Sequence, residues 1–168
     1  IAYEEIKKID PDAKVGTVSN CYVNNEKGMD FFDEYMRQGG WQYMDAYTFH
    51  PYLNNYFEKQ NYGQYFEYYK KAFAEVGKPD MEFWLTEIGY TSVDKSIGTK
   101  ERQGILNSAS AVMYDAMQYA DLMSIYNFEG KGLSEIHRED MFGHVSPLYE
   151  DAKKFGTWGV PYISYVIM

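Results

Sequence analysis

Short apolar segments that suit β-strands alternate along the chain with longer segments whose apolar residues recur at helical spacing. We predict strands over residues 14–20, 43–49, 81–90 and 122–128, and helices over residues 1–9, 29–37, 62–76, 99–119 and 147–155. Strands that alternate strictly with helices are joined by right-handed crossovers and lie parallel in one sheet. The pattern therefore predicts an α/β fold, and its four strand–helix units are half the number found in an eightfold barrel.

The segment over residues 81–90 is largely apolar, and Glu87 is the single carboxylate close to its C-terminal end. Its length and its flanking Pro79 and Gly89 favour a strand that is buried on both faces. An ionised carboxylate inside such a strand is costly unless it is paired or hydrogen-bonded. We therefore expect Glu87 at the C-terminal mouth of the strand, where α/β proteins place their chemistry. The alternative is a structural carboxylate that caps a loop or pairs with a lysine.

Two predictions concern which side chains face the core. Alternation along the strand puts Trp84 on the opposite face from Leu85 and Glu87, and we expect Trp84 to pack between strand and helix. The helix over residues 99–119 has an apolar stripe that we expect to be buried. That stripe consists of Ile105, Leu106, Ala109, Val112, Met113, Ala116 and Met117.

Polar or aromatic side chains follow each predicted strand. They are Asn20, the pair His50 and Tyr52, Glu87, and the segment from Tyr126 through Asn127 to Phe128 and Glu129. The C-terminal ends of parallel strands lie on one side of a sheet, so one pocket is expected to collect these side chains. The structural alternatives are a hydrogen-bonded core histidine for His50 and turn caps for the two asparagines.

Composition excludes several classes of partner. The net charge of −9 argues against nucleic acid or an anionic membrane, because both require basic patches. Cys21 is the single cysteine, which excludes an internal disulfide, and the scattered histidines support no metal site. No glycine-rich phosphate-binding motif is present, so no nucleotide cofactor is expected. The 18 tyrosines suit either sugar binding or an aromatic core.

Several short motifs, in order along the chain, resemble the C-terminal half of the clan A glycoside hydrolases. Phe83-Trp84-Leu85-Thr86-Glu87-Ile88-Gly89 resembles the family motif on the seventh barrel strand, and His50-x-Tyr52 resembles the motif at the end of the sixth. Residues 6–15, with Asp10-Pro11 and Lys14-Val15, resemble the lead from the fourth helix into the fifth strand. The stretch from Met141-Phe142-Gly143 to Pro147-Leu148-Tyr149 resembles the approach to the last helix. The resemblance implies half of a (β/α)8 TIM barrel, strands 5–8 with their helices, as a single partial domain over residues 1–168.

The resemblance also implies a retaining glycosidase with Glu87 as its nucleophile. Such enzymes hold two carboxyl groups about 5 to 5.5 Å apart, one attacking the anomeric carbon and one protonating the leaving oxygen. Tyr52 would donate a hydrogen bond to the Glu87 carboxylate, and His50 would bond a sugar hydroxyl or the partner carboxylate. Asn20, Tyr126 and Phe128 would line the sugar site, the last two where the family usually has a tryptophan.

The family acid/base glutamate lies on strand four, and this chain starts after that strand. Asn25-Glu26 copies the family dipeptide but falls in a predicted polar loop over residues 24–28. We therefore expect little hydrolysis from the chain by itself, because acid/base assistance is worth about 10²–10⁴-fold in rate.

Three classes of function stay open at this point. They are a glycoside hydrolase, a non-catalytic carbohydrate-binding half-barrel, and an α/β domain of unrelated function. A half-barrel exposes two strand edges, so we expect either a homodimer or a missing N-terminal half to complete it. The polysaccharide-degrading class suggests an extracellular or periplasmic location.

Overall fold

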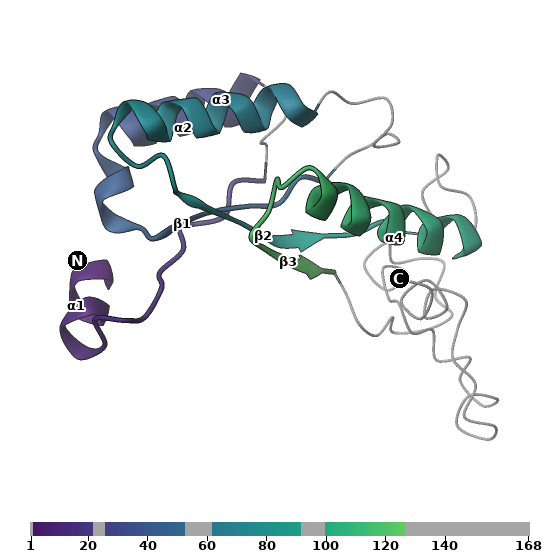
Figure 1. The fold of residues 1–168 in the computed structure, drawn as a ribbon, viewed down its shortest axis with the longest axis horizontal. Helices are drawn as coiled ribbons and strands as arrows, with labels where there is room; N and C mark the ends of the chain where they lie inside the picture. The colour runs from purple at the N-terminus through teal and green to yellow at the C-terminus, as the bar shows by residue number, and fades with distance from the viewer. Residues whose placement is uncertain (1, 22–25, 53–61, 92–99, 127–168) are drawn as a thin grey trace. The chain divides into compact units, whose positions relative to one another are not determined.

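The computed structural model describes residues 2–21, 26–52, 62–91 and 100–126. From β1 onward, strands and helices alternate along these residues (Figure 1). The elements are α1 (Ala2–Ile9), α2 (Glu26–Arg37), the 3₁₀ helix η1 (Gly40–Tyr43), β1 (Ala46–Phe49), α3 (Tyr62–Glu75), β2 (Glu82–Ile88), α4 (Lys100–Ala116) and β3 (Leu122–Ile125). The predicted helix over residues 147–155 lies outside the described residues.

The strands form one sheet in the order β1-β2-β3. β1 and β2 are parallel, with Ala46 opposite Glu82 and Phe49 opposite Leu85. β3 adjoins β2 through the amides of Asp121 and Tyr126, which donate to the carbonyls of Phe83 and Ile88 at 2.8 and 2.7 Å. The predicted α/β fold with a parallel sheet is confirmed.

The predicted strand over residues 14–20 is present as an extended segment beside β1 rather than as a continuous strand. It pairs with β1 through two isolated parallel bridges, Gly16 with Ala46 and Asn20 with Phe49. Between the bridges, the Thr48 amide donates to the hydroxyl of Thr17 at 3.0 Å instead of to a backbone carbonyl. A side chain has replaced one backbone acceptor, which interrupts the regular ladder.

The predicted helix boundaries mostly agree with the structure. α3 ends at Glu75, and Gly77 follows it with a φ of 80°, the left-handed conformation that favours glycine. The Lys78 amide closes the last turn on the carbonyl of Phe73 at 2.9 Å. The prediction of a polar loop over residues 24–28 is wrong in part, because α2 already begins at Glu26.

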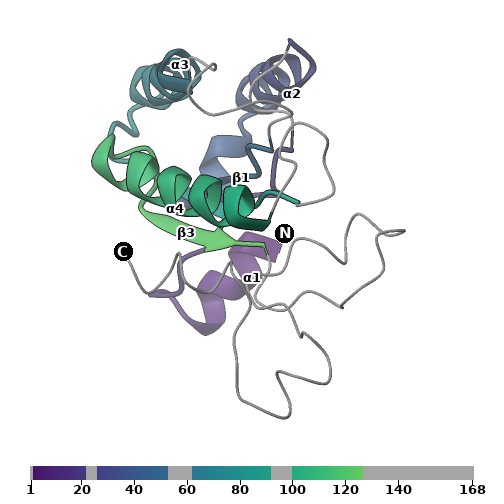
Figure 2. The ribbon, with the colours of Figure 1, turned by 90° about the vertical axis from the view of Figure 1, so that its right-hand side faces the viewer.

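The chain divides into two compact units. The first comprises Ile1–Tyr52, Gln60–Thr86 and Gln118–Met123, and the second comprises Leu53–Lys59, Glu87–Met117 and Ser124–Met168. In the first unit, α2 and α3 lie side by side over one face of β1 (Figures 1 and 2). Its core is aromatic and is formed by Phe32 of α2, Phe66, Tyr69 and Phe73 of α3, Tyr47 and Phe49 of β1, and Phe83 of β2.

Trp84 lies on the other face of the sheet, which corrects the prediction that it packs between strand and helix. Its neighbours in β2, Phe83 and Leu85, are the buried side chains, and Phe83 contacts Phe66 and Phe73 of α3. The indole instead lies against Gly16, and its Nε1–H donates to Glu82 at 2.9 Å. Alternation correctly separated Trp84 from Leu85, but the helices cover the face that Leu85 occupies.

In the second unit, the predicted buried stripe of α4 is wrong for four of its residues. The exposed members are Ile105, Val112, Ala116 and Met117, while Leu106 is buried as expected. The other buried side chains of the helix are Gln103, Asn107, Ser110, Ala111 and Tyr114. This face is turned by roughly 200° from the stripe of Ile105 and Val112, at about 100° per residue.

The polar side chains on the buried face of α4 all bind Tyr90, which follows β2. Gln103 donates to the Tyr90 carbonyl at 2.6 Å, Asn107 accepts from the Tyr90 amide at 3.2 Å, and Ser110 donates to the Tyr90 hydroxyl at 3.2 Å. Polar groups can be buried at low cost when they are hydrogen-bonded in this way. Hydropathy by itself therefore selected the wrong face.

Candidate active site

The end of β1 and the end of β2 meet at the same edge of the sheet. His50 directly follows β1, Thr86 lies near the end of β2, and His50 Nε2 is 3.0 Å from Thr86 Oγ1. The parallel register of the two strands brings these positions together. His50 and Thr86 are therefore neighbours where β1 and β2 end, and the convergence of the predicted strand-end side chains on one pocket stays a prediction.

A chain of hydroxyl groups runs from this point along the face of the sheet that carries Trp84. Ser19 Oγ lies 2.9 Å from Thr86 Oγ1 and donates to Thr48 Oγ1 at 3.1 Å. Thr48 Oγ1 in turn donates to the carbonyl of Thr17 at 2.6 Å. Sequence reasoning did not single out Ser19, Thr48 or Thr86, although hydroxyl side chains at alternate positions of apolar strands are a signal that could have found them.

The other ring nitrogen of His50 faces a thiol. Nδ1 lies 3.6 Å from the Sγ of Cys21, an exposed residue. The ring of Tyr52 meets the His50 imidazole edge to face at 6.5 Å, and the Tyr52 amide donates to the His50 carbonyl at 2.9 Å. The predicted pair His50 and Tyr52 thus forms one compact turn at the end of β1.

Asn20 lies beneath this turn in the core. Its side-chain amide donates to the carbonyl of Gly28 at 3.2 Å and to the hydroxyl of Tyr47 at 3.0 Å. Burial raises the pKa of the Tyr47 hydroxyl above its ordinary value, and the bond from Asn20 acts in the opposite direction. The carbonyl of Asn20 accepts from the His50 amide at 2.9 Å, so Asn20 ties α2 and β1 to the turn that carries His50.

Glu87 and Tyr126 belong to the second unit. Burial alternates along β2 through Phe83 and Leu85, and the next buried residue is Ile88 rather than Glu87. Glu87 is thus partly exposed at the C-terminal end of the strand. Tyr126 is also partly exposed, while Phe128 lies outside the described residues.

A cluster of polar groups around the Asp45 carboxylate lies at the opposite end of β1. Asp45 accepts hydrogen bonds from the Tyr3 hydroxyl at 3.0 Å and the Val15 amide at 2.9 Å, and it pairs with Lys7 at 2.9 Å. Burial acts to raise the pKa of the Asp45 carboxyl, but these bonds together lower it below its ordinary value. Because it precedes the strand, this cluster anchors α1 to the sheet and takes no part in the site at the strand ends.

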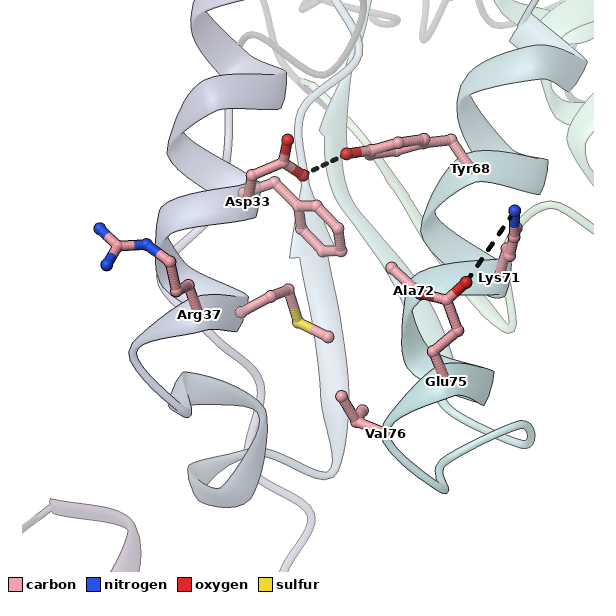
Figure 3. Close-up of a pocket in the computed structure, with 9 residues that line it drawn as sticks. Asp33, Arg37, Tyr68, Lys71, Ala72, Glu75 and Val76 are labelled. Carbon is pink, nitrogen blue, oxygen red and sulfur yellow. Dashed lines mark hydrogen bonds and ion pairs between the residues drawn. The ribbon is translucent and has the colours of Figure 1, made fainter.

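A pocket of about 430 Å³ lies between α2 and α3, on the outside of the sheet (Figure 3). The Tyr68 hydroxyl donates to Asp33 across one end of it, and Lys71 pairs with Glu75 at 3.9 Å on its α3 side. Burial and the bond to Asp33 raise the pKa of Tyr68 to about 12. No strand-end residue lines this pocket, so it is separate from the site around His50.

The described part of the chain contains neither a candidate metal centre nor a candidate membrane span. Within it, no three His, Cys, Asp or Glu side chains group in a way that could hold a metal ion. No helix among the same residues combines the length and the apolar character needed to cross a bilayer.

Residues 1–143 match the family model described as the glycosyl hydrolase catalytic core. The chain belongs to the glycosyl hydrolase catalytic core family. This match covers the strand-end site, β2 and α4, and it agrees with the resemblance that was read from the motifs. No curated protein sequence matches this family member significantly.

Solved structures similar to this glycosyl hydrolase core include three glycosidases. A family 39 glycoside hydrolase from the gut symbiont Bacteroides cellulosilyticus WH2 matches 98% of the chain with a TM-score of 0.73 at 19% identity. A glucosidase from Croceicoccus marinus matches 86% with a TM-score of 0.64 at 16% identity. An FMN-binding beta-glucuronidase from Facaelibacterium prausnitzii L2-6 matches 96% with a TM-score of 0.52 at 15% identity.

This glycosyl hydrolase core spans only part of the length of each of these proteins. The matches cover 35%, 30% and 24% of the three longer chains, respectively. At these identities the likeness shows the fold, which is that of part of a glycosidase barrel.

Proposed function

We propose that this chain is the C-terminal half of a retaining glycoside hydrolase barrel, strands 5–8 with their helices, and that Glu87 is the nucleophile. The hydrogen bond between His50 and Thr86 carries the proposal, because it joins the ends of two neighbouring parallel strands. Glu87 is the next residue after Thr86 in β2. Membership of the glycosyl hydrolase catalytic core family supports the reaction class.

The reaction would proceed by double displacement. The Glu87 carboxylate attacks the anomeric carbon, the bond to the leaving oxygen breaks as an acid protonates it, and a glycosyl ester forms. Water then attacks the same carbon with the help of the deprotonated acid, which releases the sugar and regenerates the carboxylate. The partial exposure of Glu87 suits this role, since a nucleophile must be reachable by substrate.

The acid/base carboxylate would come from a part of the protein outside this chain. Glu26, which copies the family dipeptide, is the first residue of α2 and therefore begins a helix that follows the extended segment, rather than ending a strand. The isolated chain should consequently show little or no hydrolysis, because one of two cooperating groups is missing. The barrel would be completed either by an N-terminal half or by a second copy of this chain. Light scattering on the purified chain would distinguish a dimer of two copies from a monomer.

The proposed sugar-binding residues are His50, Tyr52, Tyr126 and Phe128. His50 and Tyr52 would provide a polar and an aromatic surface at the end of β1, which suits a sugar ring. The burial of Asn20, with its amide committed to Gly28 and Tyr47, favours a supporting role for Asn20 over direct sugar contact.

Covalent trapping tests the proposal. A 2-deoxy-2-fluoro glycosyl fluoride reacts with the nucleophile of a retaining enzyme, and the glycosyl ester then breaks down slowly. A glucosyl and a glucuronyl probe are the first choices, because the similar structures include a glucosidase and a beta-glucuronidase. In a protein that carries the whole barrel, mass spectrometry of peptides should find the label on Glu87, and Glu87→Gln should abolish it.

Glu82→Gln is the matched control, because Glu82 lies in the same strand and pairs with Lys14. That variant should still be labelled on Glu87. Labelling of a different carboxylate during good turnover would remove Glu87 from the role. Sugar binding with no labelling and no turnover would favour the non-catalytic carbohydrate-binding alternative.

A further inference from the structure

The hydroxyl chain that ends at His50 has a defined direction, because each hydroxyl group has a single hydrogen to donate. Thr48 gives its hydrogen to the carbonyl of Thr17 at 2.6 Å, and a carbonyl can only accept. Thr48 Oγ1 therefore accepts from Ser19 Oγ, at 3.1 Å. The first two bonds of the chain are fixed by this one carbonyl.

The same reasoning assigns the donor and the acceptor of each later hydrogen bond, as far as the imidazole of His50. Ser19 has used its hydrogen on Thr48, so at 2.9 Å from Thr86 Oγ1 it must accept, and Thr86 must donate. Thr86 has then used its own hydrogen, so at 3.0 Å from His50 Nε2 it must accept. Nε2 is thereby the protonated nitrogen of the neutral ring, and Nδ1 carries the lone pair.

We propose that Ser19, Thr48 and Thr86 are positioning residues that fix His50 in the Nε2–H tautomer, so that its Nδ1 accepts a hydrogen bond from a sugar hydroxyl. This inference rests on the proposed function for the identity of the ligand. It selects between the two partners that the sequence left open for His50. A neutral ring whose Nδ1 is an acceptor suits a hydroxyl donor and repels a carboxylate, which can only accept.

The surroundings of Nδ1 agree with this assignment. The atom faces the Sγ of Cys21 at 3.6 Å, and a thiol is a weak donor. A sugar hydroxyl is a stronger donor and can take the place of the thiol. Cys21 is exposed and His50 is partly exposed, so a ligand can approach the thiol that lies beside Nδ1.

The tautomer can be measured directly on the 168-residue chain with ¹⁵N-labelled histidine. Two-bond ¹⁵N–¹H correlation spectra at a pH of about 8, where an ordinary histidine is neutral, distinguish the two tautomers. His50→Gln assigns the signal among the three histidines. We expect His50 to be protonated on Nε2, and a ring protonated on Nδ1 would overturn the proposal.

Two substitutions remove the constraint on the direction of the hydroxyl hydrogen bonds and leave His50 itself unchanged. Thr48→Val removes the acceptor of Ser19, whose hydrogen can then turn toward Thr86 and reverse the path. Ser19→Ala removes the acceptor of Thr86, whose hydrogen can then turn toward Nε2. Each should raise the Nδ1–H population of His50 several-fold.

Thr17→Val is the matched control. Thr17 fixes the direction through its backbone carbonyl, which the variant keeps, while the variant loses a hydroxyl from the same cluster. The His50 tautomer should stay as in the wild type. Two results would contradict the role of the hydroxyl chain in fixing the His50 tautomer. One is a change in the tautomer population in Thr17→Val as large as that in Thr48→Val, and the other is no change in either Thr48→Val or Ser19→Ala.

A sugar titration separates this inference from the proposed function. With methyl β-glucoside and methyl β-glucuronide as probes, binding should move the Nδ1 signal of His50 and leave the proton on Nε2. A probe that binds and leaves the Nδ1 signal unmoved would overturn the acceptor role. Failure of all such glycosides to bind a protein that carries the whole barrel, with the variant pattern as expected, would count against the proposed function and support the assigned tautomer.

Discussion

Gly16 packs against the indole of Trp84, and Thr48 occupies the space that a side chain at Gly16 would need. A β-carbon added to Gly16 would lie 3.2 Å from Cε3 of the indole and 2.4 Å from Cγ2 of Thr48. The extended segment before β1 therefore approaches the sheet at a distance that only glycine permits.

Gly16→Ala should destabilise the chain by about 1–3 kcal/mol, the usual cost of overpacking a filled site. Urea denaturation of the purified chain measures the change in the free energy of unfolding. Thr48→Ser removes the methyl group nearest to the added carbon, so the double variant should recover part of the loss. Equal losses with and without Thr48→Ser would show that the predicted clash is absent.

Asn20→Ala should cost about 1–3 kcal/mol, because the buried Tyr47 hydroxyl and the Gly28 carbonyl would lose their donor. Tyr47→Phe removes one of those groups and should cost less. A double-mutant cycle should show a favourable coupling between the two side chains. Strictly additive effects would argue that the bond between Asn20 and Tyr47 contributes nothing.

Stability should fall in acid through Asp45. The pKa of this carboxyl is lowered in the folded state, so its contribution is present above the unfolded pKa of about 3.9 and is lost as the pH falls through the folded value. Urea midpoints measured from neutral pH down to the acid limb should fall less steeply in Asp45→Asn than in the wild type. Tyr3→Phe, which removes one of the three partners, should give an intermediate slope.

Glu87→Ala, made in a protein that carries the whole barrel, should lower kcat by about 10³-fold or more, since loss of a covalent nucleophile leaves only binding and electrostatic assistance. Added azide should restore turnover of an activated aryl glycoside and yield a glycosyl azide of inverted configuration. A product of retained configuration would instead assign Glu87 the acid/base role. The product configuration can be read by proton NMR.

The buried face of α4 can be tested by a pair of substitutions. Leu106→Ala should cost about 2–5 kcal/mol, because Leu106 is buried, whereas Val112→Ser should stay within about 0.5 kcal/mol, because Val112 is 57% exposed. Unfolding free energies from urea titration compare the two. A loss from Val112→Ser as large as that from Leu106→Ala would show that Val112 is buried, as hydropathy predicted.

The sequence by itself determined the order of the elements and the nature of the sheet. Apolar segments that alternate between strand and helix spacing predicted α3, β2 and α4 to within a few residues, and their alternation required β1 and β2 to be parallel. It also located His50 at the end of a strand, because the apolar run stops there. These features depend on the local periodicity of apolar residues, which can be read from one sequence without knowledge of tertiary contacts.

Only the tertiary structure decided which face of each element is buried and which polar groups meet. Trp84 lies away from the helices, and α4 buries Gln103 and Asn107 instead of Ile105 and Val112. Residues far apart in the chain provide the partners that make such burial possible, as Tyr90 does for α4 and Thr48 does for Ser19. Hydropathy assigns a cost to a polar group without its partner, and the partner is known only once the chain has folded.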